Sequence, residues 1–266
     1  MFFSLLPTKI QKQIGEKCPL QLFEIIEDLR DEIIFIRENK NFDIKNKSDS
    51  SPVTKADLLV HTTFSNILNL YTPDIPVLSE ENKDSFQYVK KASLYWLLDP
   101  LDGTKEYINN YDDFAISLAL IANGKPVFGM VYAPAKNEMY LGLCKEKISY
   151  KYKDNFWYRL KPSNTKKIQK IVVSRSHFDK TTEDIVKKYN ADTVKMGSCL
   201  KFCYVAEGKA DAYIKANHFY IWDVAGGHAI LEATGCSLKN YNQENVVYNK
   251  GIKVEGIFAV NNLNLV

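Results

Sequence analysis

The sequence predicts an α+β protein whose C-terminal half is α/β. Two helical patterns open the chain, and strand patterns of the antiparallel type follow them. From Ile171 onward, short strand patterns alternate with helical ones, as in an α/β layer. With 266 residues, the chain is long enough for one compound domain or for two lobes. The change of pattern near Lys161–Lys170 divides it into an N-terminal lobe, residues 1–165, and a C-terminal lobe, residues 166–266.

The N-terminal half carries two helices and then several strands. The segment Leu20–Lys40 has helical apolar spacing, and its apolar face consists of Phe23, Ile26, Leu29, Ile33 and Ile36. Lys55–Tyr71 predicts a second helix, with Thr54 as its cap. Leu94–Leu98 is short, aromatic and aliphatic, which predicts a buried strand that stops at Asp99–Pro100. A short strand that ends in acids precedes it, Asn123–Gly124 predicts a hairpin, and a further strand is expected at Glu138–Leu143.

The C-terminal half alternates strands with helices. Strands are predicted at Ile171–Val173, Thr193–Met196 and Asp211–Ile214. Helices are predicted near Lys180–Lys188, Ser198–Glu207 and Asp223–Ala233.

Charge and cysteine content limit the classes of protein to consider. Thirty-five basic and 32 acidic residues leave a net charge of +3, which does not indicate a nucleic-acid or membrane partner. The basic, aromatic segment 151–170 is better explained as a solvated hairpin and linker than as a nucleic-acid patch. Five cysteines without a Cys-x-x-Cys pair favour reduced thiols and a cytoplasmic setting.

The first residues predict neither a signal peptide nor a membrane span. The opening MFFSLLP has no basic region, and no apolar stretch in the chain approaches eighteen residues. An amphipathic contact of this segment with the inner face of the cell membrane stays open as an alternative. The oligomeric state cannot be derived from the sequence.

Acidic residues stand at the ends of several predicted elements. They are Asp57, Glu80, Glu81, Asp99, Asp102 and Asp223. Hard divalent cations such as Mg²⁺ prefer oxygen ligands, and carboxylates from separate elements that meet at one point would form such a site. Two cations there can neutralise a phosphoryl group and acidify a water molecule, which Asp57 and Thr104 would orient.

Each of these residues also has a plain structural explanation. Asp-Pro-Leu-Asp-Gly is an acceptable acidic turn, and Asp223 can be a simple helix cap. His177 can be a loop histidine, and Lys201 can lie on a helix surface. The combination of Asp-x-x-Asp-Gly-Thr with Trp-Asp and the small run Ala225-Gly226-Gly227 favours a functional site over these explanations.

The chain resembles the lithium-sensitive phosphatase superfamily that includes inositol monophosphatase. Four stretches carry this resemblance: DPLDGTKEY, WDVAGGHAIL, SPVTKAD and PVLSEEN. Within it, the chain is most similar to the bacterial 3′(2′),5′-bisphosphate nucleotidases of the CysQ family. Three further stretches carry this similarity: VSRSH, GSCLKFCYVAEGKADAY and GKPVFGMVYAPAKNEMY. The resemblance runs from about Ser51 to Gly235, and the first fifteen or so residues look like an extension. It implies a five-layer αβαβα sandwich with the site between the two lobes.

The resemblance also implies roles for individual residues. Asp57 and Thr104 match the pair that activates the attacking water. The implied Mg²⁺ ligands, for two or three ions, are Glu80, Asp99, the main-chain carbonyl of Leu101, Asp102 and Asp223. The implied substrate-binding residues are Glu80, Leu101, Asp102, Gly103, Thr104, Ser174, His177, Gly197, Lys201 and Asp223.

The implied activity is Mg²⁺-dependent hydrolysis of the 3′-phosphate of adenosine 3′,5′-bisphosphate, a small phosphorylated nucleotide, to AMP and phosphate. The 3′-phosphoadenylyl sulfate is a second implied substrate. An inositol or sugar phosphatase of the same superfamily and a non-catalytic phosphate-binding domain stay open. An aspartyl-phosphate phosphatase is disfavoured, because DPLDGT has one residue too many between its acids.

The chain departs from the CysQ pattern just before Trp222. Lys215 stands where an arginine is usual, and Asn217-His218-Phe219 replaces Gly-Pro-Thr. After Asp223, Gly226 replaces the usual alanine. These changes leave the metal residues in place and put substrate selection in question. His218 and Phe219 could stack on a base or could fill space.

Overall fold

The computed structural model describes residues 4, 8–47, 52–163 and 165–262. Its helices are α1 (Thr8–Gly15), α2 (Gln21–Glu38), α3 (Lys55–Tyr71), α4 (Phe86–Val89), α5 (Thr104–Ile108), α6 (Lys180–Lys187), α7 (Leu200–Ala206) and α8 (Ile221–Thr234), with the 3₁₀ helices η2 (Glu80–Ser85) and η3 (Pro134–Lys136). Its strands in the first half are β1 (Lys45–Asn46), β2 (Pro52–Val53), β3 (Val77–Ser79), β4 (Leu94–Asp102), β5 (Ala115–Ala122), β6 (Lys125–Ala133), β7 (Glu138–Leu143), β8 (Ile148–Lys153) and β9 (Phe156–Arg159). Those in the second half are β10 (Lys170–Ser174), β11 (Asp192–Met196), β12 (Ala212–Lys215), β13 (Phe219–Tyr220), β14 (Ser237–Asn240), β15 (Lys253–Val254) and β16 (Ile257–Val260).

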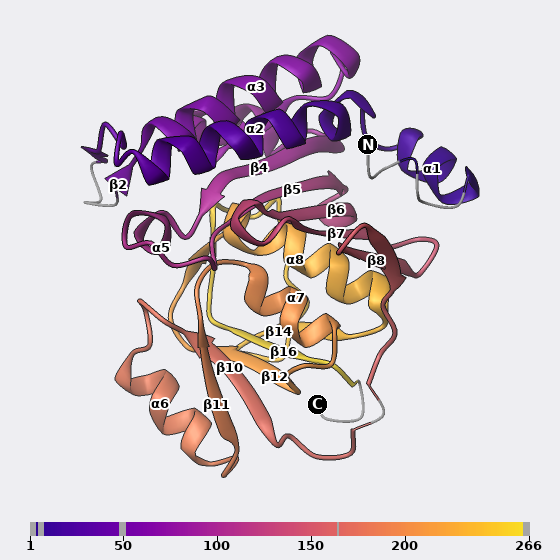
Figure 1. The fold of residues 1–266 in the computed structure, drawn as a ribbon. Helices are drawn as coiled ribbons and strands as arrows, with labels where there is room; N and C mark the ends of the chain where they lie inside the picture. The colour runs from indigo at the N-terminus through magenta and orange to yellow at the C-terminus, as the bar shows by residue number, and fades with distance from the viewer. Residues whose placement is uncertain (1–3, 5–7, 48–51, 164, 263–266) are drawn as a thin grey trace.

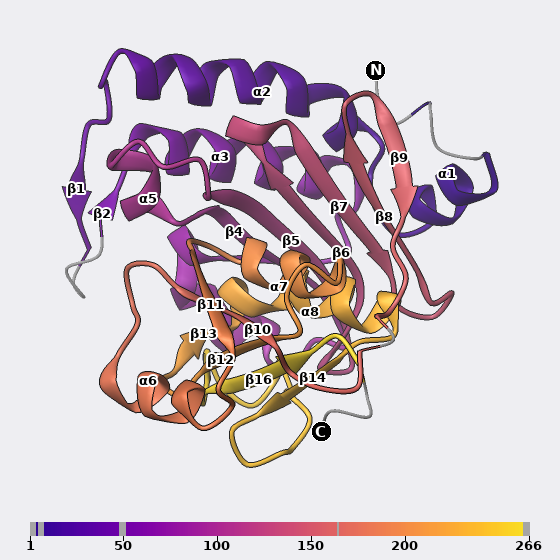
Figure 2. The same ribbon diagram turned by 60° about the horizontal axis from the view of Figure 1, so that its bottom comes forward.

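Five layers follow one another in the order αβαβα (Figure 1). Helices α2 and α3 cover one face of a seven-stranded sheet ordered β3-β4-β5-β6-β7-β8-β9. Helices α7 and α8 form the middle layer, and a five-stranded sheet ordered β11-β10-β12-β16-β14 lies beneath them. Helix α6 packs on the outer face of that second sheet (Figures 1 and 2). The predicted α+β and α/β halves and the five-layer sandwich are therefore confirmed.

The two sheets differ in strand direction. In the larger sheet β3 and β4 are parallel and every later pair is antiparallel. In the smaller sheet β10 is parallel to β11 and β12, whereas β16 runs antiparallel to β12 and β14. The first three strands of the C-terminal half thus have the parallel order that their alternation with helices predicts.

The predicted helices and turns are formed by the expected residues. Every member of the apolar face predicted for Leu20–Lys40 is buried in α2. Asn123 and Gly124 have φ of 50° and 76°, as a two-residue hairpin turn requires. The basic, aromatic segment contains the β8–β9 hairpin, with Asp154 and Asn155 at its turn. Helix α1 places Ile10 and Ile14 in the core, so this part of the N-terminal extension is packed.

One predicted strand end is wrong. Strand β4 does not stop at Asp99–Pro100 but continues to Asp102, with a register shift between these two aspartates. Pro100 has no amide hydrogen for the ladder, so pairing is interrupted there and resumes where Asp102 faces Ala115. The strand therefore has a bulge that places two carboxylates at its end.

The middle helices join the two halves of the molecule. The chain leaves the first sheet at Arg159 and enters the second at Lys170. Helices α7 and α8 then pack between the sheets, in one apolar core that residues from both halves share. The division into lobes at residues 1–165 and 166–266 stays a prediction.

No helix in the described part of the chain is long and apolar enough to cross a membrane, and the opening MFFSLLP lies mostly outside the described residues.

Candidate active site

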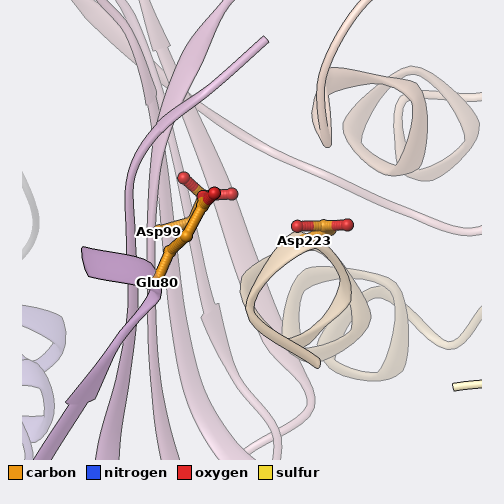
Figure 3. Close-up of side chains that lie close together, drawn as sticks. All are labelled: Glu80, Asp99 and Asp223. Atoms are coloured by element: carbon orange, nitrogen blue, oxygen red, sulfur yellow. The ribbon is translucent and has the colours of Figure 1, made fainter. Parts of the chain in front are cut away.

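Asp99, Glu80 and Asp223 converge at one point between the large sheet and the middle layer (Figure 3). Asp99 comes from β4, Glu80 begins η2 directly after β3, and Asp223 lies in the first turn of α8. One carboxylate oxygen from each residue lies within 4.8 Å of the others. These three of the five predicted metal residues are therefore brought together by elements that are far apart in the chain.

The position of Asp223 depends on close packing of α8. A Cβ atom at Gly226 would lie 2.5 Å from Ser117 Oγ, and one at Gly227 would lie 2.5 Å from Phe202. Only residues without a side chain allow the start of α8 to approach β5 and α7 this closely. The sequence predicted that this helix begins at Asp223. The helix in fact begins at Ile221, so Asp223 is its third residue. Its carboxylate accepts the Tyr220 N–H at 3.1 Å.

Burial and mutual repulsion act on these carboxylates in the same direction. Burial raises the pKa of Asp99 well above its ordinary value, and the charges of Glu80, Asp102 and Asp223 raise it further. The pKa of Asp223 is raised for the same reasons, by burial and then by Asp102 and Glu80. Such a cluster is stabilised in its charged form by a cation between its members. Because every donor is a carboxylate oxygen, the set fits a hard cation such as Mg²⁺.

Asp102 and Leu101 lie beside this point but have other partners. The Asp102 carboxylate accepts the Cys199 N–H, and burial raises its pKa to about 6 although nearby Lys201 acts to lower it. The Leu101 carbonyl accepts a hydrogen bond from the Thr104 hydroxyl at 3.1 Å. Both residues line the same cavity as the three converging carboxylates.

Lys47 is a cation that sequence reasoning missed. Its Nζ lies 2.6 Å from Glu80 Oε1 and 2.6 Å from Glu81 Oε1. Burial raises the pKa of Glu81, and the hydrogen bond from Lys47 acts against that shift. Lys47 belongs to a polar loop whose sequence gives no sign of a partner in η2. Ser51, where the family resemblance begins, lies outside the described residues.

Asp57 and Thr104 are in contact, as the sequence had suggested. Asp57 is buried in the first turn of α3, where its Oδ2 accepts the N–H and the hydroxyl of Thr54. Its Oδ1 is 3.2 Å from Thr104 Oγ1, at the start of α5. Burial raises the pKa of Asp57 to about 7, against the effect of the Thr54 hydrogen bonds. A carboxylate with that pKa can exchange a proton near neutral pH.

The residues predicted to contact the nucleotide line the same cavity as the carboxylates, and its volume is about 540 Å³. They are Ser174, His177, Gly197 and Lys201. The Ser174 hydroxyl accepts the His177 N–H at 3.2 Å. Burial and then the charges of Lys105, Lys215 and Lys201 lower the pKa of His177 to about 4. Lys201 is buried and donates to the Ser198 carbonyl, so the helix-surface alternative for this lysine is wrong.

The segment that departs from the CysQ pattern also reaches this cavity. Phe219 is buried, and Lys215 Nζ lies 3.8 Å from the centre of its ring. The Phe219 ring also meets Tyr213 edge to face. Phe219 therefore fills space and supports Lys215, whereas His218 is exposed at the cavity wall.

Comparison with known proteins agrees with this fold. The chain belongs to the inositol monophosphatase family, whose sequence model matches residues 17–262. The 3′(2′),5′-bisphosphate nucleotidase CysQ of Escherichia coli O6:H1 is 39% identical to it over 210 residues, which cover 79% of this chain and 84% of that protein.

Two solved structures extend the comparison. The chain matches the crystal structure of CysQ from Bacteroides thetaiotaomicron with a TM-score of 0.74 and 33% identity, over 88% of this chain and 93% of that one. A staphylococcal inositol monophosphatase matches with a TM-score of 0.79 and 18% identity, over 96% and 91% of the two chains, and shows the fold alone.

Proposed function

We propose that this protein is a Mg²⁺-dependent 3′(2′),5′-bisphosphate nucleotidase. It removes the 3′-phosphate from adenosine 3′,5′-bisphosphate, giving AMP and phosphate, and also accepts 3′-phosphoadenylyl sulfate. One observation carries the proposal: a single cavity is lined both by the converging carboxylates and by Lys105, Lys201, Lys215 and His177. A substrate with two phosphates matches such a cavity, because one phosphate can be cleaved while cationic groups hold the other. A volume of about 540 Å³ lies in the ordinary range for small ligands.

The acidic part of the cavity is assigned to the scissile phosphate. Glu80, Asp99, Asp102, Asp223 and the Leu101 carbonyl would hold two or three Mg²⁺ ions, which would neutralise charge on the phosphate and acidify the attacking water. Gly103 and Thr104 hold the phosphate from the turn that follows β4. The three converging carboxylates, whose charges repel one another, support this assignment.

Asp57 and Thr104 are assigned to the attacking water. The Thr104 hydroxyl accepts a hydrogen bond from the water and donates its own hydrogen to the Asp57 carboxylate, which receives the proton through that hydroxyl. The water oxygen forms a bond to phosphorus while the bond from phosphorus to the ribose 3′ oxygen breaks. The leaving oxygen then takes a proton from solvent. The 3.2 Å contact between Thr104 and Asp57 supports the pair.

Ser174, His177, Gly197 and Lys201 are assigned to the nucleotide and its second phosphate. Lys201 is the strongest candidate for that phosphate, because it is buried within the cavity and its pKa is lowered chiefly by burial. An anion beside it would compensate for the water that it has lost. His177 provides a second hydrogen-bond donor at the same wall.

Two other functions would use the same acidic centre. An inositol monophosphatase needs the carboxylates but not this set of cationic groups. A sugar bisphosphatase would use the cationic groups for its second phosphate, so only the substrate comparison separates it from the nucleotidase. A non-catalytic phosphate-binding domain would be expected to have lost a metal ligand or Thr104, and this chain has kept all of these residues.

All five cysteines are buried free thiols, which supports a cytoplasmic location.

The test is phosphate release from adenosine 3′,5′-bisphosphate, inositol 1-phosphate and fructose 1,6-bisphosphate, each with and without Mg²⁺. The proposal expects a Mg²⁺-dependent preference for the nucleotide. A preference for inositol phosphate or the sugar would leave the metal centre standing and remove the nucleotide assignment. No release from any of the three would favour the binding domain.

A further inference from the structure

Asp113 connects the two sides of the cavity. It lies between α5 and β5, next to the Asp-Gly-Thr turn, and its side chain is buried. Its Oδ2 accepts Arg175 Nη2–H at 2.9 Å and Arg175 Nε–H at 3.3 Å, and it also accepts the Gly197 N–H. Arg175 directly follows β10, and Gly197 directly follows β11. One carboxylate of the N-terminal half therefore holds the ends of two strands of the second sheet.

Glu106 makes a similar contact one turn into α5. Its side chain is buried, and its Oε1 accepts the Ser176 hydroxyl at 2.5 Å. Ser176 lies between the candidate substrate residues Ser174 and His177. We call Asp113 and Glu106 the carboxylate clasp, because together they hold residues 174–177 and Gly197.

The main chain of Asp113 also fixes the spacing between two turns. A Cβ atom at Gly103 would lie 3.3 Å from the Asp113 carbonyl oxygen, and one at Gly197 would lie 2.6 Å from the same oxygen. Gly103 belongs to the Asp-Gly-Thr turn, whereas Gly197 belongs to the loop that lines the nucleotide side of the cavity. Asp113 thus lies between the turn that holds the scissile phosphate and the loop assigned to the nucleotide, in contact distance of both.

Arg175 is held in the orientation that the clasp needs. Its guanidinium group lies 4.3 Å above the Tyr111 ring, and its main-chain N–H donates to the Met196 carbonyl at 3.0 Å. Burial would raise the pKa of Asp113, but the hydrogen bonds from Gly197 and Arg175 lower it below its ordinary value. Asp113 is therefore charged at neutral pH, and charged hydrogen bonds are the stronger kind.

We propose that Asp113, supported by Glu106, is a positioning residue that sets the distance between the metal centre and the nucleotide-binding loops. This inference rests on the proposed function, because it assigns the recognition of the second phosphate to those loops. The clasp side chains hydrogen-bond to Arg175, Gly197 and Ser176, and not to the converging carboxylates or to the pair Asp57 and Thr104. Loss of the hydrogen bonds from the clasp to the loops should weaken binding of a substrate that spans both sides of the cavity. It should leave the rate of the chemical step nearly unchanged.

The kinetic test compares Asp113→Asn with the matched control Asp112→Asn. Asp112 is the preceding residue, is largely exposed and pairs with Arg37 instead. Asp113→Asn should raise KM for adenosine 3′,5′-bisphosphate by about tenfold, with kcat within about threefold of the wild type. Hydrolysis of p-nitrophenyl phosphate, a monoester without a second phosphate, should stay within about twofold. Asp112→Asn should resemble the wild type with both substrates.

Amide hydrogen exchange provides a readout that needs no substrate. Asp113→Asn should speed exchange in residues 174–177 and 196–199 by about tenfold, and Asp112→Asn should not. Asp113→Glu keeps the charge and should recover part of the protection and of KM. The proposal is overturned if Asp113→Asn matches the control in exchange or in KM, or if both substrates lose the same factor in kcat.

The two proposals fail in different ways. If the wild type does not prefer the bisphosphate, the proposed function fails, and the exchange measurement still decides whether the clasp holds the loops. If the wild type does prefer it and Asp113→Asn keeps the wild-type KM, the clasp fails while the proposed function stands.

Discussion

Thr104 Oγ1 lies 3.2 Å from Asp57 Oδ1, and this contact links the start of α5 to the first turn of α3. Thr104 follows the bulged end of β4, so the link also brings Asp57 next to the strand that carries Asp99. The Asp57 carboxylate is held on its other oxygen by Thr54. The pair is therefore fixed from both sides before any substrate binds.

Thr104→Ala is predicted to lower kcat by about a hundredfold or more, because the hydroxyl that connects the water to Asp57 is lost. Thr104→Ser keeps the hydroxyl and is the control, which should retain most of the activity. Steady-state phosphate release from the bisphosphate measures both. Equal activity in the two variants would show that this hydroxyl takes no part in the reaction.

Asp99→Asn is predicted to abolish turnover while the protein stays folded. The substitution removes a buried charge that its neighbours repel, so the metal-free variant should be at least as stable as the wild type. Titration calorimetry with Mg²⁺ should show weakened binding, and the exposed Asp74→Asn should bind as the wild type does. A variant that retains most of its activity would contradict the role of Asp99 at the metal centre.

Asp57 is predicted to make the metal-free protein less stable as the pH rises from about 4 to about 7. Asp57 has a pKa of about 7 in the folded protein, above the ordinary value of about 3.9 that applies after unfolding. Between these two pKa values the folded state keeps a proton on Asp57 that the unfolded state has lost, and the contribution of Asp57 to the free energy of unfolding falls as the pH rises.

His177 and His228 act with the opposite sign, because their pKa values are lowered to about 4. The unfolded histidines still hold about half of their protons at about pH 6.5 and lose nearly all of them by about pH 7.5, so their effect overlaps that of Asp57. Denaturant titrations of chelated protein at several pH values measure the slope. From about pH 4 to about pH 7, the free energy of unfolding of Asp57→Asn should fall less, or rise more, than that of the wild type. The same pH dependence in both proteins would assign the effect to other groups.

Gly129→Ala is predicted to destabilise the protein by about 1–3 kcal/mol, because the added methyl group overpacks the interface of β6 with α8. Its Cβ atom would lie 2.5 Å from Ala229 Cβ and 2.6 Å from the Gly226 carbonyl oxygen. At Gly251 the same substitution meets nothing within 4 Å and provides the control. Chemical unfolding should separate the two variants, and similar midpoints would mean that α8 can shift away from the sheet at little cost.

Lithium is predicted to inhibit at millimolar concentration or below, as the family resemblance implies. Li⁺ is a small, hard cation that prefers oxygen ligands, so it would compete for the carboxylates around Asp99 but could not supply the same charge. Phosphate release at increasing LiCl, with NaCl at equal ionic strength as the control, measures the effect. Full activity at high lithium would indicate that one of the proposed Mg²⁺ positions is absent or altered.

The sequence by itself determined the main helices, most of the strands that precede α8, and most of the residues that line the cavity, whereas β14 and β16 of the second sheet were not predicted. Local patterns are sufficient for this: apolar residues at helical spacing predict α2, and Asn123–Gly124 predicts the turn between β5 and β6. The motif residues Asp57, Thr104 and Asp223 were recognised because their neighbours in the chain are distinctive. Even the bulge after Asp99 has a local cause in Pro100, although its continuation to Asp102 depends on pairing with β5.

Only the tertiary structure decided which of these groups meet. It placed Glu80, Asp99 and Asp223 within 4.8 Å of one another, brought Lys47 to Glu80, and buried Lys201 in the cavity. It also showed that Asp113 reaches Arg175, 62 residues further along the chain. The physical reason is that contacts of this kind depend on how distant segments pack, and the spacing of residues along one segment carries no information about a partner on another.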